Sequence, residues 1–107
     1  MWLATEPIEE FMNHGLSSED LAVIRQCFGS DSNKVWLFGS RARGDYKRYS
    51  DIDLLMDPDH EITSSRLSEI REALEESSLP FKVDLVRASE LAEPYRNGVF
   101  RDRVKLF

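Results

Sequence analysis

The strongest constraint on the fold of this chain is a Gly-Ser pair followed, ten residues later, by an Asp-x-Asp pair. Gly39 and Ser40 end one short apolar run, and Asp51 and Asp53 open a second one. Side chains alternate between the two faces of a strand, so these two carboxylates fall on the same face. Hard divalent cations bind oxygen ligands of this kind, and a Gly-Ser turn offers backbone amides and a hydroxyl to a phosphate. The pattern therefore predicts a site for a metal-bound nucleotide between two short strands.

The remaining sequence predicts helices and strands around this site. Short alternating, β-branched or aromatic runs predict three strands, at residues 34–38, 51–56 and 81–86. Helical spacing and capping signals predict helices over residues 5–14, from an N-cap at 17–20 to Phe28, at 40–43, over 62–77, and at 88–91 and 95–104. We expect Pro94 to break the helical stretch before it and Gly98 to interrupt the last helix. The order predicts an α/β fold, with a small mixed β-sheet flanked by helices.

Length and composition indicate one soluble domain that spans residues 1–107. The chain is 41% hydrophobic and 32% charged, and no stretch approaches the ~20 apolar residues of a membrane span. Its N-terminus lacks the pattern of a signal peptide, and a single cysteine, Cys27, permits no intramolecular disulfide. These features favour a reducing, cytoplasmic location without a membrane. The net charge of −6 argues against broad nucleic-acid binding, which depends on many lysines and arginines.

Four basic residues interrupt this acidic composition between the Gly-Ser and Asp-x-Asp pairs. They are Arg41, Arg43, Lys47 and Arg48. One interpretation is a solvated loop, and the other is a clamp for a triphosphate. The position between the two pairs favours the clamp, with Arg43 as its main member and with Arg41 and Lys47 more exposed to solvent.

A third carboxylate, Asp84, lies between apolar residues of the predicted third strand. If this strand neighbours the second one, Asp84 comes level with Asp51 and Asp53. Three like charges this close raise one another's pKa unless cations offset them. Two Mg²⁺ ions would remove the repulsion and hold both the attacking and the leaving oxygen of a phosphoryl transfer.

The run from Gly39 to Asp57, GSRARGDYKRYSDIDLLMD, resembles the Gly-Ser-x10-Asp-x-Asp signature of the DNA polymerase β nucleotidyltransferase superfamily. In particular it resembles the minimal nucleotidyltransferases, which are often encoded beside a HEPN partner as its antitoxin. The similarity extends from the helix before the first strand, through Asp84, to the C-terminal residues. It implies a polymerase β-like fold, ATP as substrate and Mg²⁺ as cofactor.

The resemblance also implies roles for individual residues. Asp51, Asp53 and Asp84 would ligate metal and form the catalytic set, with Asp84 also a possible acceptor of the hydroxyl proton. Gly39 would leave room for the triphosphate and Ser40 would bind its β- or γ-phosphate, while Arg43 would neutralise the leaving pyrophosphate. Ser50 would cap the loop or touch the nucleotide.

Three functions are compatible with these features. The first is transfer to a second polypeptide, because the chain has no room for a domain that grips another acceptor; the resemblance implies that this polypeptide is a HEPN-family toxin adenylylated on a tyrosine. The second is a non-catalytic antitoxin that neutralises its partner by contact, and the third is a transferase for a small molecule or RNA end. The apolar residues Val99, Phe100, Val104, Leu106 and Phe107 either cover the sheet or contribute to a partner interface. A hetero-oligomer and a homodimer are both compatible with the sequence.

Overall fold

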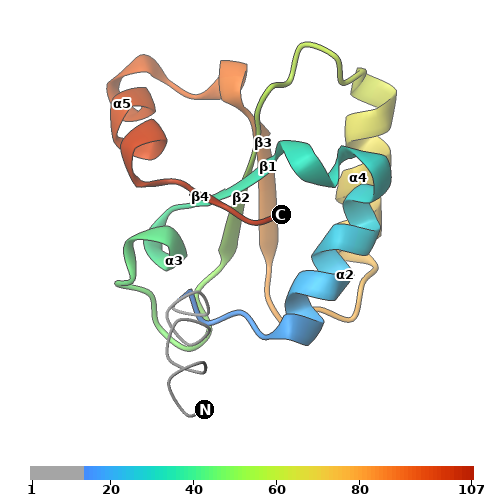
Figure 1. Ribbon diagram of the computed structural model, residues 1–107, viewed down its shortest axis with the longest axis horizontal. Helices are drawn as coiled ribbons and strands as arrows, with labels where there is room; N and C mark the ends of the chain where they lie inside the picture. Colours follow the sequence, from blue (N-terminus) through green and yellow to red (C-terminus); the bar gives the residue numbers. More distant parts are fainter. Residues whose placement is uncertain (1–13) are drawn as a thin grey trace, which may run out of the picture.

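The computed structural model describes residues 14–107 and contains a four-stranded mixed sheet with helices on both faces (Figure 1). The strands are β1 Val35–Phe38, β2 Ile52–Met56, β3 Val83–Arg87 and β4 Val104–Lys105. They lie in the order β3-β2-β1-β4. The β1 strand is antiparallel to both β2 and β4, whereas β2 and β3 are parallel. The fold predicted from the sequence is therefore confirmed.

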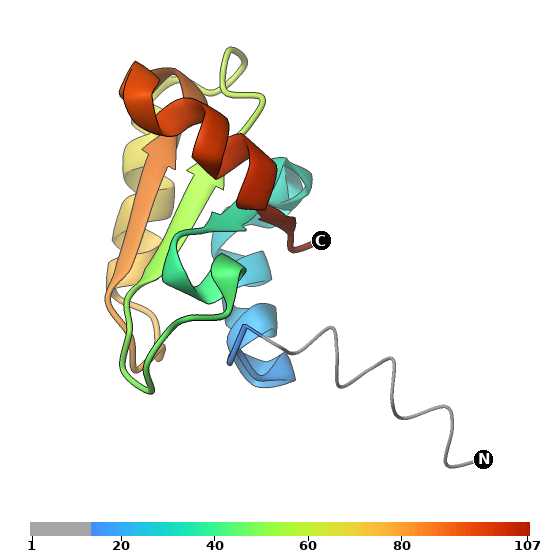
Figure 2. The ribbon, with the colours of Figure 1, turned by 90° about the vertical axis from the view of Figure 1, so that its left-hand side faces the viewer.

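Helices cover the two faces of the sheet unequally. The helical segments are α2 Ser18–Phe28, the 3₁₀ turn Gly29–Lys34, α3 Ser40–Arg43, α4 Ser64–Glu75, the 3₁₀ turn Ala88–Glu90 and α5 Glu93–Asp102. The α2 and α4 helices lie on one face, and α5 crosses the other (Figures 1 and 2). The short α3 helix follows β1 directly and lies near the end of the sheet where β2 begins (Figure 2).

The main core lies between the sheet and the α2–α4 pair. Ile24 and Phe28 of α2, Leu37 and Leu54 of the strands, and Ile70 of α4 are all fully buried there. Burial of one such side chain contributes about 1.5–3 kcal/mol, so this layer accounts for most of the apolar stabilisation. Because side chains alternate along the strands, the opposite face is left for the polar residues of the site and for contacts with α5.

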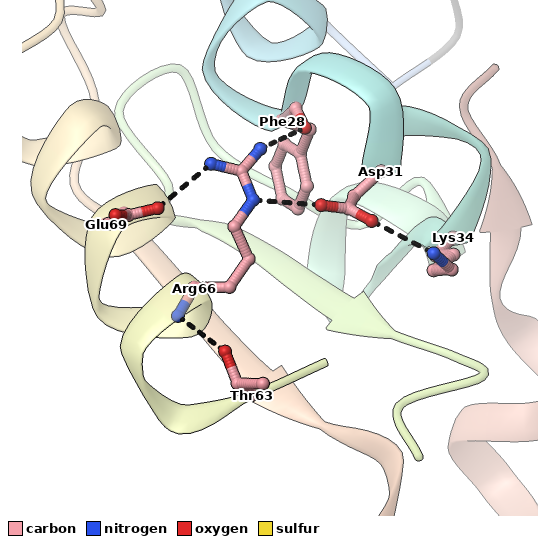
Figure 3. Close-up of polar contacts among 6 residues, drawn as sticks. All are labelled: Phe28, Asp31, Lys34, Thr63, Arg66 and Glu69. Atoms are coloured by element: carbon pink, nitrogen blue, oxygen red, sulfur yellow. Dashed lines mark hydrogen bonds and ion pairs between the residues drawn. The ribbon is translucent and has the colours of Figure 1, made fainter. Parts of the chain in front are cut away.

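The α2 and α4 helices begin with side-chain caps. The Ser17 hydroxyl accepts from the Asp20 amide while the Asp20 carboxylate accepts from the Ser17 amide, which is a complete capping box. At the start of α4, the Thr63 hydroxyl accepts from the Arg66 amide (Figure 3). The acidic first turn of α2 also complements the helix dipole.

A network centred on Arg66 joins α4 to the end of α2 (Figure 3). The Arg66 guanidinium donates to the Asp31 carboxylate at 2.9 Å and to the Phe28 carbonyl at 2.8 Å. Asp31 also pairs with Lys34 at 2.9 Å, and both contacts lower the pKa of the Asp31 carboxyl. This network lies on the side of the sheet away from α5 and supports the fold rather than the site.

Several local predictions are corrected. A 3₁₀ turn, Gly29–Lys34, follows α2 in the interval between Phe28 and the first strand, for which no helix was predicted. Pro94 occupies the first turn of α5, where its missing amide costs no hydrogen bond, and α5 continues through Gly98 without a break. The β4 strand was not predicted, because two residues carry too little alternation to detect. The helix predicted at 5–14 lies almost wholly outside the described residues.

No helix in residues 14–107 is long and apolar enough to cross a membrane.

Candidate active site

Asp53 and Asp84 lie side by side on the sheet face that α5 shares. The β2–β3 register pairs Asp53 with Asp84, and the β1–β2 register pairs Asp53 with Phe38. The next residues, Leu54 and Leu85, turn to the opposite face and are buried in the main core. Alternation along two parallel strands thus places two carboxylates together, as the sequence analysis expected. Asp51 immediately precedes β2 and is exposed.

The pKa of the Asp53 carboxyl is raised by its burial and by both other acids. Burial is the largest cause that raises the pKa of the Asp53 carboxyl, and the negative charges of Asp84 and Asp51 raise it further. The positive charge of Arg43 acts in the opposite direction. Burial and the neighbouring charges therefore disfavour the ionised form of Asp53, and a cation placed beside the carboxylates would favour it.

Gly39 connects this group to the turn after β1. Its backbone has φ 77° and ψ −156°, a region that glycine alone adopts readily. A β-carbon built on Gly39 would overlap the Asp53 carboxylate, with its Cγ atom only 3.1 Å away. The sequence analysis expected Gly39 to leave space for a triphosphate. That role stays a prediction, and the structure shows that the missing side chain lets the Asp53 carboxylate lie directly against the Gly-Ser turn.

The other predicted nucleotide-binding residues surround the same turn. Ser40 opens α3, and its carbonyl accepts from the Gly44 amide at 3.0 Å. The Arg43 side chain is 48% exposed and pairs with Asp45 at 3.3 Å. The Ser50 hydroxyl accepts from the Lys47 amide at 2.7 Å, so Ser50 caps the loop, which is one of its two predicted roles. Their contacts with a nucleotide stay predictions.

Arg41 differs from the expectation that it is solvated. It is 2% exposed, and its guanidinium donates to the carbonyl oxygens of His14 and Ser50. The burial of Arg41 could not be predicted from the sequence pattern, because the aromatic rings beside its guanidinium come from separate segments. They are Tyr46, in the loop after α3, and Phe81, before β3. Of the four basic residues, Arg41 therefore cannot contribute to a clamp at the surface.

A hollow of about 680 Å³ extends from the turn to the underside of α5. Gly39 and Arg43 line one end of it, and Val86, Tyr95 and Val99 line the rest. Its size lies within the range of small-molecule sites, and its lining is mainly apolar with a few polar groups at the rim. The sequence analysis identified no such hollow, because α5 meets the sheet only through tertiary packing.

The C-terminal apolar residues divide between two roles. Val99 lines the hollow, and Leu106 and Phe107 pack against the main core. Phe100 and Val104 are 39% and 38% exposed. Val99, Leu106 and Phe107 are therefore partly buried, and Phe100 and Val104 are the more exposed; a partner interface on these residues stays a prediction.

A family model described as "Polymerase beta, Nucleotidyltransferase" matches residues 17–107, which include every element described above. The chain belongs to this family. It is a nucleotidyltransferase, and the Gly39–Ser40 turn with Asp51 and Asp53 corresponds to the signature on which the sequence-level resemblance rested.

Two curated relatives of this nucleotidyltransferase carry closely similar names. A Haemophilus influenzae protein named "Probable protein adenylyltransferase MntA" is 33% identical over 88 residues, which are 80% of this chain and 77% of the relative. A Thermococcus cleftensis protein named "Protein adenylyltransferase MntA" is 35% identical over 81 residues, which are 76% of this chain and 79% of the relative.

A solved structure is also similar to this nucleotidyltransferase. It is described as a toxin-antitoxin crystal structure with AMP-PNP, and it superposes with a TM-score of 0.58 at 25% sequence identity. The alignment covers 82% of this chain and 73% of that one. The fold of the sheet and its helices is therefore shared with a protein crystallised with an ATP analogue.

The acids of this nucleotidyltransferase have the right chemistry for a hard divalent cation. Carboxylate oxygens are the ligands that Mg²⁺ prefers, and Asp53 and Asp84 supply them from adjacent strands. As the side chains stand in residues 14–107, no group of three acidic, histidine or cysteine residues is arranged to hold an ion. Asp51, the third predicted ligand, is exposed and lies immediately before β2.

Proposed function

We propose that this nucleotidyltransferase is a cytoplasmic protein adenylyltransferase, which uses ATP and Mg²⁺ to transfer AMP to a tyrosine of a HEPN-family toxin and so acts as its antitoxin. The observation that carries this proposal is the pairing of Asp53 with Asp84 beside the Gly39–Ser40 turn. The names of the relatives and of the AMP-PNP-bound structural neighbour support the same substrate and a toxin partner.

The chemistry follows from where the charges lie. A hydroxyl oxygen of the acceptor attacks the α-phosphorus of ATP, the bond from that phosphorus to the bridging oxygen breaks, and pyrophosphate leaves. In this proposal the carboxylate of Asp84, which is exposed on the edge strand β3, takes the hydroxyl proton. Bound Mg²⁺ would supply positive charge against the phosphate oxygens and against the carboxylates.

Other residues bind and orient the nucleotide in this proposal. The Ser40 hydroxyl donates to a β- or γ-phosphate oxygen, and Arg43 exchanges its exposed ion pair with Asp45 for the pyrophosphate. An exposed ion pair contributes little stability, so this exchange costs little. The nucleoside then occupies the hollow beneath α5, which begins at Gly39 and Arg43. Most of the rate enhancement comes from this positioning and from preplaced charge.

The test uses ATP labelled on its α-phosphate, Mg²⁺ and the protein encoded beside this chain. We expect label to appear on that partner with the native chain and not with an Asp51→Ala/Asp53→Ala variant. ATP labelled on its γ-phosphate should leave the partner unlabelled, because the pyrophosphate departs. Equal labelling by the native chain and the double variant would contradict catalysis at these acids.

A parallel measurement separates catalysis from contact. If Asp53→Asn neutralises the partner as well as the native chain does, the antitoxin acts by binding. Label on RNA or on a small molecule, with none on protein, would replace the proposed acceptor.

A further inference from the structure

The geometry points to Arg41 as a positioning residue, whose buried guanidinium fixes the distance between the phosphate-binding turn and Asp51. This inference rests on the proposed function for its activity readout. Arg41 is one residue after Ser40 in α3, and its guanidinium holds the carbonyl oxygen of Ser50, one residue before Asp51. One side chain therefore joins the two ends of the ten-residue interval between Ser40 and Asp51.

Arg41 lies in the short helix α3, and its buried guanidinium has a partner for each of its nitrogen atoms. Its Nε and Nη2 atoms donate to the Ser50 carbonyl at 3.1 and 2.9 Å, and its Nη1 atom donates to the His14 carbonyl at 3.0 Å. The guanidinium also lies 4.9 Å from the Tyr46 ring centroid and 4.5 Å from that of Phe81. A buried cation is costly unless its donors are satisfied, and these carbonyls and rings satisfy it.

The forked contact with Ser50 orients the backbone at Asp51. A peptide unit is planar, so fixing the Ser50 carbonyl also fixes the amide nitrogen of Asp51. The loop before it is otherwise weakly held: Lys47, Arg48 and Tyr49 are exposed, and the Lys47–Ser50 contacts lie within the loop itself. The first residue of the loop stays attached to α3 through the Asp45 amide and the Ser40 carbonyl, but without Arg41 the far end of the loop, at Arg48 and Ser50, would lose its attachment to α3.

A lysine in place of Arg41 is the sharpest perturbation. It keeps the charge and most of the stem but lacks the planar fork that contacts one carbonyl through two nitrogens. Arg41→Met removes the charge as well and serves as a second variant. The matched control is Arg66→Lys, because Arg66 also joins two segments through a carboxylate and a carbonyl (Figure 3). Arg66 belongs to α4, on the opposite face of the sheet from Asp53 and Asp84 (Figure 1).

Two readouts distinguish positioning from a purely structural role. We expect Arg41→Lys to lower kcat on the order of 10²-fold while KM for ATP changes less than about threefold. Amide hydrogen exchange in residues 47–52 should quicken by roughly tenfold in Arg41→Lys, without the rest of β2 following. Arg66→Lys should lower Tm, leave kcat within about twofold, and leave exchange in residues 47–52 unchanged.

The inference is overturned if Arg41→Lys retains native kcat and native exchange in residues 47–52, or if Arg66→Lys loses as much kcat at equal stability. Should Arg41→Met fail to fold, Arg41→Lys decides the matter alone. If the native chain transfers no AMP, the proposed function fails, and the exchange comparison still tests whether Arg41 holds the loop.

Discussion

Gly39→Ala is expected to lower both stability and catalysis, because both the backbone conformation at this position and its contact with Asp53 exclude a side chain. At φ 77° and ψ −156°, a non-glycine residue costs about 1–3 kcal/mol of backbone strain. The new β-carbon would also overlap the Asp53 carboxylate, which must then move away from Gly39 and out of its present position in the site. We place the total loss of unfolding free energy at about 3 kcal/mol, at the upper end of single-residue strain.

The control is Gly44→Ala at the other end of α3. Gly44 has φ 84° and ψ 7°, which is the left-handed region, and a β-carbon there would meet no atom within 4 Å. This substitution should cost only about 1 kcal/mol, from the left-handed backbone alone.

Thermal unfolding and AMP transfer together measure the difference. For a domain of this size, we expect a Tm decrease of roughly 15 °C for Gly39→Ala and roughly 5 °C for Gly44→Ala. Transfer should fall on the order of 10²-fold in Gly39→Ala, measured below its Tm, because an acid is displaced from the site. Equal effects of the two substitutions on Tm and on transfer would refute the contact between Gly39 and Asp53.

Two further predictions concern the acids and the hollow. Because the pKa of Asp53 is raised in the fold, the native state binds its proton more tightly than the unfolded chain, so stability falls as pH rises from the ordinary aspartate range through the raised value. Asp53→Asn should therefore have a higher Tm than the native chain at pH 7 but not at pH 3, and it should no longer transfer AMP. The control is Glu72→Gln at an exposed position, and an equal rise in Tm for this variant would contradict the reasoning. Val99→Trp should fill the hollow and raise KM for ATP by roughly tenfold at similar kcat. Phe100→Trp, a change at the exposed neighbouring residue, should leave KM for ATP unchanged. An unchanged KM in both variants would show that the nucleoside does not bind in this hollow.

Sequence reasoning located the strands and acids because their signals are local. Alternation places Asp53 on one face of β2, and apolar neighbours place Asp84 likewise on β3. Only the parallel β2–β3 pairing, which is a long-range property, was needed to bring them together. The helix start at Ser17 was equally local, because a cap and its helix lie within four residues. The cap at Thr63 was not predicted, and that helix was expected from residue 62.

The features that escaped prediction all depend on segments distant in sequence. The burial of Arg41 needs Phe81 and His14, and nothing near residue 41 indicates either contact. The close approach of the Asp53 carboxylate to Gly39 depends on where the Asp53 side chain lies once β1 and β2 have paired. The hollow requires α5 to cross the sheet, and the run of residues 93–102 contains a proline and a glycine that argue against a continuous helix.

The central claim is that Asp51, Asp53 and Asp84 hold a metal-bound nucleotide beside the Gly39–Ser40 turn. Manganese with a non-hydrolysable ATP analogue tests it directly, because Mn²⁺ broadens the NMR signals of nearby nuclei. We expect broadening to centre on the amides of residues 39, 53 and 84 and to vanish in an Asp51→Ala/Asp53→Ala variant that retains its fold. Broadening centred elsewhere on the chain, or broadening that persists in that variant, would contradict the claim.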